Sequence, residues 1–81
     1  MKVLVLWNTI EDSIKGYLIP ESVNEIALQC SGKYINTVNL SDDDPLYQLC
    51  EELDKLPYFE AEEKPLDCRD YDKIVICGFI P

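Results

Sequence analysis

The sequence predicts a small α/β domain with a three-stranded, mainly parallel sheet, the chain order β-α-β-α-β and helices on both faces. Two short apolar runs, residues 2–7 and 73–80, contain β-branched residues and no polar alternation. Such strands are typical of parallel sheets that are covered on both faces. Two segments with helical spacing lie between these runs, and connections of that length join parallel strands. The chain has 81 residues, of which 47% are hydrophobic, so we predict a single domain over residues 1–81.

Each predicted helix combines an apolar stripe with start or stop signals. In residues 20–31 apolar side chains recur at i, i+3, i+4 and i+7, Pro20 suits the first turn and Gly32 suits the C-terminal cap. Residues 44–56 repeat this spacing, and Asp44 followed by Pro45 is a strong start signal. The apolar positions are Val23, Ile26, Ala27 and Cys30 in the first helix, and Leu46, Leu49, Cys50 and Leu53 in the second.

The remaining segments complete the predicted topology. Residues 34–40 alternate partially and indicate a third, more exposed strand, while residues 14–19 favour a short hairpin strand around Gly16. Residues 57–72 form a long acidic loop with two prolines. The first strand is apolar on both faces and should be central, which gives the strand order 2-1-3. The last strand would then be an apolar edge that the long loop or another chain must cover.

Negative charge is concentrated in one half of the chain. The formal net charge is −9, and residues 42–72 hold twelve of the sixteen acidic residues but only three basic ones. Outside this window the charges cancel. A one-sided negative field selects basic partners and repels nucleic acid, anionic phosphates and anionic lipid. We therefore expect a basic protein partner, and no nucleic-acid or membrane partner.

The residue types argue against an enzyme or a metal protein. The chain has no histidine, which is the commonest general base and metal ligand. Its four cysteines form no C-x-x-C pair, and Cys68, the one that we predict to be exposed, has acidic neighbours that would raise its pKa. We predict no cofactor and no metal site. The sequence shows no signal-peptide pattern and no apolar run of membrane-spanning length, which favours a cytoplasmic location with reduced thiols.

Polar residues follow the predicted strands, where parallel α/β sheets carry their ligand sites. Asn8 and Thr9 follow the first strand and Ser41 follows the second, so a small-molecule or divalent-cation site at these strand ends is the alternative function. The acids of residues 42–44 suit a hard cation. Helix capping and the helix dipole explain the same three acids without a metal.

In the order of its elements the chain resembles a truncated flavodoxin-like or nucleotide-binding half-domain. The phosphate loop of those families is rich in glycine and hydroxyl groups. The corresponding segment here, residues 8–13, has no glycine and contains two acids, Glu11 and Asp12, which would repel phosphate. The resemblance therefore implies an architecture and no activity.

Aromatic residues are interleaved with the acids of residues 42–72, as is typical of protein interfaces. Small inhibitors from phages, plasmids or toxin–antitoxin systems are similar in size and charge, including those that mimic the charge pattern of DNA. We predict a non-enzymatic protein-binding module, an inhibitor or modulator, that engages a basic surface of a nucleic-acid-binding protein or nuclease. The predicted partner-binding residues are Asp42, Asp43, Glu51, Glu52, Tyr58, Phe59, Glu60, Glu62 and Glu63.

Two further expectations concern apolar residues. The last strand, through Ile74, Val75, Ile76 and Phe79, is predicted to pair with its symmetry mate in a homodimer. Tyr58 and Phe59 have a second interpretation, in which they anchor the long loop on the sheet.

Overall fold

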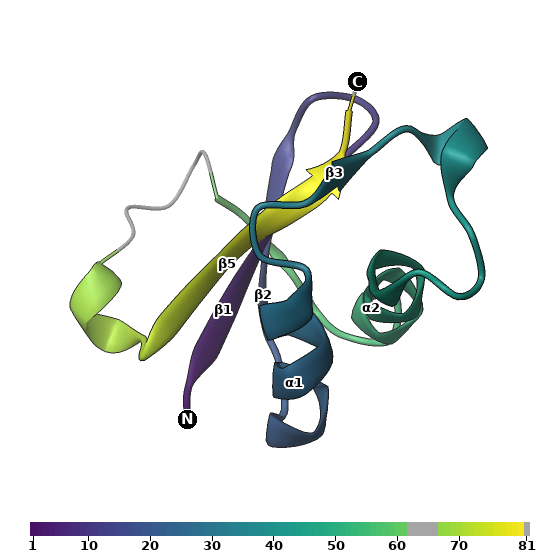
Figure 1. Cartoon of the computed structure of the whole chain (residues 1–81). Coiled ribbons are helices and arrows are strands. Elements are labelled where there is room, and N and C mark those ends of the chain that lie inside the picture. The colour runs from purple at the N-terminus through teal and green to yellow at the C-terminus, as the bar shows by residue number, and fades with distance from the viewer. Residues whose placement is uncertain (62–66, 81) are drawn as a thin grey trace.

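The computed structural model describes residues 1–61 and 67–80, without the side chains of Thr37 and Cys68. Its strands form one five-stranded mixed sheet (Figure 1). They are β1 (Val3–Asn8), β2 (Ile14–Leu18), α1 (Glu21–Gln29), β3 (Tyr34–Ile35), α2 (Pro45–Leu53), β4 (Phe59–Glu60) and β5 (Lys73–Phe79), with the short 3-10 helices η1 (Thr37–Asn39) and η2 (Cys68–Asp70).

The predicted three-stranded, mainly parallel sheet of order 2-1-3 is wrong. The strand order is β3-β5-β1-β2-β4, in which β5 is parallel to both β1 and β3, while β2 and β4 add antiparallel pairs. The two long apolar strands, β1 and β5, pair directly with each other along their whole length, from Val3 opposite Lys73 to Asn8 opposite Gly78. Pairing in the centre removes both apolar strands from the edges, where they would be exposed. The predicted strand over residues 34–40 shortens to Tyr34–Ile35 at one edge.

A hairpin joins β1 to β2, as the pattern around Gly16 predicts. The turn is closed by the Thr9 amide, which donates to the Ser13 carbonyl at 2.8 Å, and by a 2.7 Å hydrogen bond between the two side-chain hydroxyls. Asp12 adopts a positive φ of 63°, which aspartate tolerates better than most residues. The hairpin places β2 antiparallel to β1, and β4, within the predicted loop of residues 57–72, pairs with β2.

Both helices lie on one face of the sheet, so the prediction of helices on both faces is also wrong (Figure 1). Val3, Val5 and Trp7 alternate along β1 toward this face, because successive side chains of a strand point to opposite faces. They share one core with both helices. Its buried members are Val3, Val5, Trp7, Tyr17, Val23, Ala27, Cys30, Leu46, Leu49, Leu53, Val75 and Cys77.

The other face of the sheet carries neither α1 nor α2. Figure 1 shows η2 on the side away from α1 and α2. Leu4 is fully buried, but Leu18 and Ile76 on the same face stay about half exposed. Cover on this face is therefore incomplete, and the expectation that the apolar runs are covered on both faces holds only in part.

The last strand is not an edge strand, which corrects the basis of the predicted self-association. β5 lies between β1 and β3, and its end pairs with β3 through Gly78 and Phe79. The side chain of Val75 is buried in the core, and Phe79 packs edge-to-face on Trp7 with ring centroids 5.3 Å apart. Ile76 remains half exposed on the face away from the helices. Homodimer formation itself stays a prediction.

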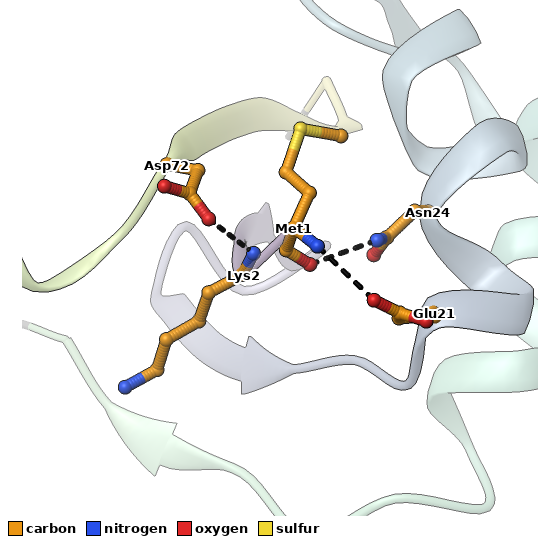
Figure 2. Close-up of polar contacts among 5 residues, drawn as sticks. All are labelled: Met1, Lys2, Glu21, Asn24 and Asp72. Atoms are coloured by element: carbon orange, nitrogen blue, oxygen red, sulfur yellow. Dashed lines mark hydrogen bonds and ion pairs between the residues drawn. The ribbon is translucent and has the colours of Figure 1, made fainter.

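Polar contacts connect the residues just before β1 with α1 and with Asp72, which directly precedes β5 (Figure 2). The Met1 amino group lies 3.1 Å from the Glu21 carboxylate, and the Asn24 side-chain amide donates to the Met1 carbonyl at 3.0 Å. The Lys2 amide donates to the Asp72 carboxylate at 2.6 Å, while the Asp72 amide donates back to the Lys2 carbonyl at 2.8 Å. These contacts join segments that are far apart in sequence.

Capping determines where α2 begins, as the Asp44–Pro45 signal predicts. The Asp44 side chain accepts a hydrogen bond from the Leu46 amide at 2.8 Å, and Pro45 occupies the first turn. In this position the carboxylate satisfies an amide that lacks a partner within the helix.

Replacing Asp44 with alanine should lower the free energy of unfolding by about 1 kcal/mol, the usual cost of losing a side-chain N-cap. Urea denaturation followed by circular dichroism would measure the change. Asp44→Asn, which keeps the acceptor, should recover most of the loss. If the alanine and asparagine variants were equally stable, the hydrogen bond would contribute nothing.

Candidate functional site

The acidic face of this protein consists of four exposed acids: Asp42 and Asp43 just before α2, Glu51 on it, and Asp54 directly after it. Tyr47, Glu51 and Asp54 are spaced i, i+4 and i+7, so they follow one stripe of the helix. A hydrogen bond to the Glu51 side chain, followed by the charges of Glu51 and Asp42, raises the pKa of the Tyr47 hydroxyl. Asp42 therefore lies close to this stripe.

The carboxylates of the acidic face have no ion-pair partner among residues 1–61 and 67–80. The ion pairs found there join Glu52 to Lys55 at 3.7 Å, Asp67 to Arg69 at 3.0 Å, and Glu21 to the Met1 amino group. The acidic face is thus open to an external cation.

The acids near the end of α2 oppose its own dipole. Glu51, Glu52 and Asp54 occupy or follow the last turn, which contains no basic residue. The C-terminal end of a helix carries partial negative charge, so acids there destabilise the helix by a few tenths of a kcal/mol each, up to ~1 kcal/mol. A positive group bound at this end would relieve the repulsion.

A groove with a volume of about 290 Å³ lies beside this end of α2, at the carboxyl ends of β1 and β5. The β1–β2 turn forms one wall and α2 forms another. The groove is lined by Trp7, Thr9, Ile10, Glu11, Ser13, Lys15, Tyr17, Cys50, Asp54 and Phe79.

Tyr17 also lines the groove, although the residue as a whole is only 7% exposed. Burial raises its pKa, and the nearby charge of Asp54 raises it further. The hydroxyl is therefore neutral at physiological pH, and it can donate or accept a hydrogen bond in the groove.

Three further polar side chains of the groove already have partners. The hydroxyls of Thr9 and Ser13 bond to each other at 2.7 Å. The Lys15 ammonium lies 4.2 Å from the centroid of the Tyr58 ring, a cation–π contact, and Glu60 is its cross-strand neighbour. The charge of Lys15 is therefore directed toward the β4 side of the groove.

The structure brings together only some of the predicted partner-binding residues. Asp42, Asp43 and Glu51 belong to the acidic face, but Glu52 pairs with Lys55. The other predicted partner-binding residues lie in or near β4. Tyr58 contacts the Tyr17 ring, Phe59 packs over Gly16, Glu60 pairs across from Lys15, and Glu62 and Glu63 lie outside the described residues.

Tyr58 and Phe59 fit the interpretation in which they anchor the long loop. A β-carbon at Gly16 would lie 2.4 Å from the Phe59 ring, so glycine makes room for that ring. The Tyr58 ring lies 5.9 Å from the Tyr17 ring in a tilted arrangement, and Tyr58 remains 52% exposed. Tyr58 therefore still offers surface to a partner.

The strand-end pocket differs from its predicted outline. Thr9 lines it, whereas the Asn8 side chain donates to the Phe79 carbonyl at 2.8 Å and Ser41 lies elsewhere. Sequence reasoning missed Lys15, Tyr17 and Asp54. The alternation of Ser13, Lys15 and Tyr17 was a signal for the first two, because residues at i, i+2 and i+4 share one face of a strand.

Burial lowers the reactivity of two cysteine thiols. Cys30, Cys50 and Cys77 are free, and burial raises the pKa of Cys30 to about 11 and that of Cys77 to about 12. Both thiols are protonated at neutral pH and are poor nucleophiles. Among the described residues no three histidine, cysteine, aspartate or glutamate side chains are placed to hold a metal ion.

Comparison with known proteins finds no matching family model, no matching curated protein and no matching solved structure. Within residues 1–61 and 67–80, no helix has the length and apolar character needed to cross a membrane.

Proposed function

We propose that this protein is a small, non-enzymatic binding module whose acidic face engages a basic surface of another protein. The observation that supports this most directly is that the carboxylates of the acidic face have no ion-pair partner in the part of the chain that the structure describes. The partner class that best fits them is a nucleic-acid-binding protein or nuclease, whose basic groove normally receives phosphates. Inhibition or modulation of such a partner in a reducing, cytoplasmic compartment agrees with the free thiols.

The packing of α2 supports a preformed interface. Leu46, Leu49 and Leu53 are at most 3% exposed and fix one side of the helix in the core. The acidic stripe lies on a side that this packing leaves in solvent. Charges on a rigid element lose little entropy on binding, so they favour rapid association with a complementary surface.

The proposal predicts that the variant Asp42→Asn, Asp43→Asn, Glu51→Gln loses affinity for a basic partner by about 5- to 100-fold. That range corresponds to three exposed charge pairs at ~0.3–0.9 kcal/mol each. The tagged protein would be used to capture partners from a lysate of its source cells. The captured protein would then be purified, and its dissociation constant measured at low and high salt.

A matched control separates a specific face from net charge alone. Asp12→Asn, Glu25→Gln, Asp70→Asn removes three exposed acids from a turn, from α1 and from η2. This control should bind within about twofold of the unmodified protein, and high salt should release the partner. Equal losses in both variants, or binding that salt does not weaken, would contradict the proposal.

A further inference from the structure

We propose that the groove at the carboxyl ends of β1 and β5 binds the guanidinium group of an arginine side chain. This inference rests on the proposed function, since the arginine would belong to the basic partner that the acidic face attracts. The groove would then bind one arginine of the partner, and the neighbouring acidic face would attract the basic surface around that arginine.

The charges around the groove favour a cation. Glu11 and Asp54 line it and have no ion pair in the described part of the chain. Asp54 is also the C-terminal cap residue of α2, where the helix dipole adds negative potential. Lys15 is the one basic residue in the lining, and its charge is offset by the Tyr58 ring and by Glu60 across the strand pair.

The uncharged walls suit a planar cation with an apolar stem. Trp7 and Phe79 supply aromatic surface, on which a guanidinium can stack. The hydroxyl of Tyr17, which also lines the groove, can accept a hydrogen bond from one of the guanidinium N–H groups. Arginine carries five such donors, so two carboxylates and one hydroxyl can be satisfied together.

The size of the groove favours a side chain over a larger ligand. Its volume of about 290 Å³ is at the lower limit of pockets that hold drug-sized ligands, which span ~300–1,000 Å³. A lysine would fill the same space, but its ammonium has three donors and no plane to stack. The geometry therefore favours arginine over lysine.

The test uses the peptide acetyl-Gly-Arg-Gly-amide and the fluorescence of Trp7, which is the only tryptophan of the chain and lines the groove. Titration should produce a saturable change in Trp7 emission. The same peptide with citrulline, which replaces the charged guanidinium by a neutral urea, should bind at least about tenfold more weakly. The lysine peptide should fall between the two.

Protein variants locate the binding site. Asp54→Asn should weaken binding of the arginine peptide about tenfold or more, whereas Asp70→Asn should leave it unchanged. The melting temperature of Asp54→Asn should equal or exceed that of the unmodified protein, because the change removes a negative charge from the end of α2. Weaker binding with preserved or increased stability would mark Asp54 as a binding residue rather than a structural one.

Several outcomes would overturn the inference. These are the absence of a saturable Trp7 response, equal binding of the citrulline peptide, and unchanged binding by Asp54→Asn. A saturable response to Mg²⁺ or to a nucleotide, with none to the arginine peptide, would assign the groove to a small ligand instead. If the acidic-face variant still lost its partner while the arginine peptide failed to bind, this inference would fall and the proposed function would stand.

Discussion

Replacing Gly78 with alanine is expected to lower the free energy of unfolding by about 2–6 kcal/mol. Overpacking contributes ~1–3 kcal/mol of this loss and backbone strain contributes another ~1–3 kcal/mol. Gly78 has a φ of 141°, and a β-carbon there would lie 2.4 Å from the Asn8 carbonyl oxygen and 2.5 Å from the Asn8 nitrogen. Both obstacles are backbone atoms of the central strand pair, so no side chain can move aside. The total free energy of unfolding of a domain of this length is roughly 4–12 kcal/mol, at ~0.05–0.15 kcal/mol per residue, so this loss would be a large part of it.

Gly32 provides the matched control for this prediction. Its φ of 77° is also in the left-handed region, but no atom lies within 4 Å of the position that a β-carbon would take. Gly32→Ala should therefore show the backbone strain alone, about 1–2 kcal/mol. Thermal and urea unfolding of both variants would be compared. A Gly78 variant no less stable than the Gly32 variant would show that β1 and β5 are not packed as closely as described.

Replacing Leu49 with alanine should lower the free energy of unfolding by about 2–5 kcal/mol. Leu49 is fully buried, and it lies in the middle of the apolar stripe by which α2 contacts the core. Removing three methyl(ene) groups loses their transfer free energy and leaves a cavity that the β-sheet cannot fill. The same helix carries the acidic face, so partner binding should weaken as the folded fraction falls.

Leu28→Ala is the control for the loss of Leu49, because Leu28 is a helical leucine that is 38% exposed. We expect a loss of less than about 1 kcal/mol there, since little apolar area leaves the core. Urea denaturation at several temperatures would measure both values. Similar losses at the two positions would mean that α2 is not held by the described core.

The end of α2 shows how the proposed function conflicts with local stability. Glu51, Glu52 and Asp54 oppose the helix dipole, and only Glu52 has a basic partner in the described structure. Residues that break a local rule without a compensating contact are expected at binding sites. If Asp54→Asn bound the arginine peptide more weakly and was more stable, the same carboxylate would be shown to favour binding and to destabilise the helix.

Local features of the chain were predictable because their signals act over a few residues. Asp44 and Pro45 begin α2 where the capping pattern places them, and Gly16 lies in the expected hairpin strand. The acidic face was also predictable in part, because Asp42, Asp43 and Glu51 stand out by charge. Lys15, Tyr17 and Asp54 were missed as a group since they come from a strand and a helix that are distant in sequence.

The sequence by itself determined the strands β1 and β5, the two helices with their apolar stripes, and the concentration of negative charge on one half of the chain. Hydrophobic periodicity and capping chemistry determine these features within a single segment. Only the tertiary structure decided that β1 pairs with β5, that both helices share one face of the sheet, and that the groove forms beside Asp54. Those choices depend on which arrangement buries the most apolar surface. The total buried area includes contacts between residues at opposite ends of the chain, which no single segment can determine.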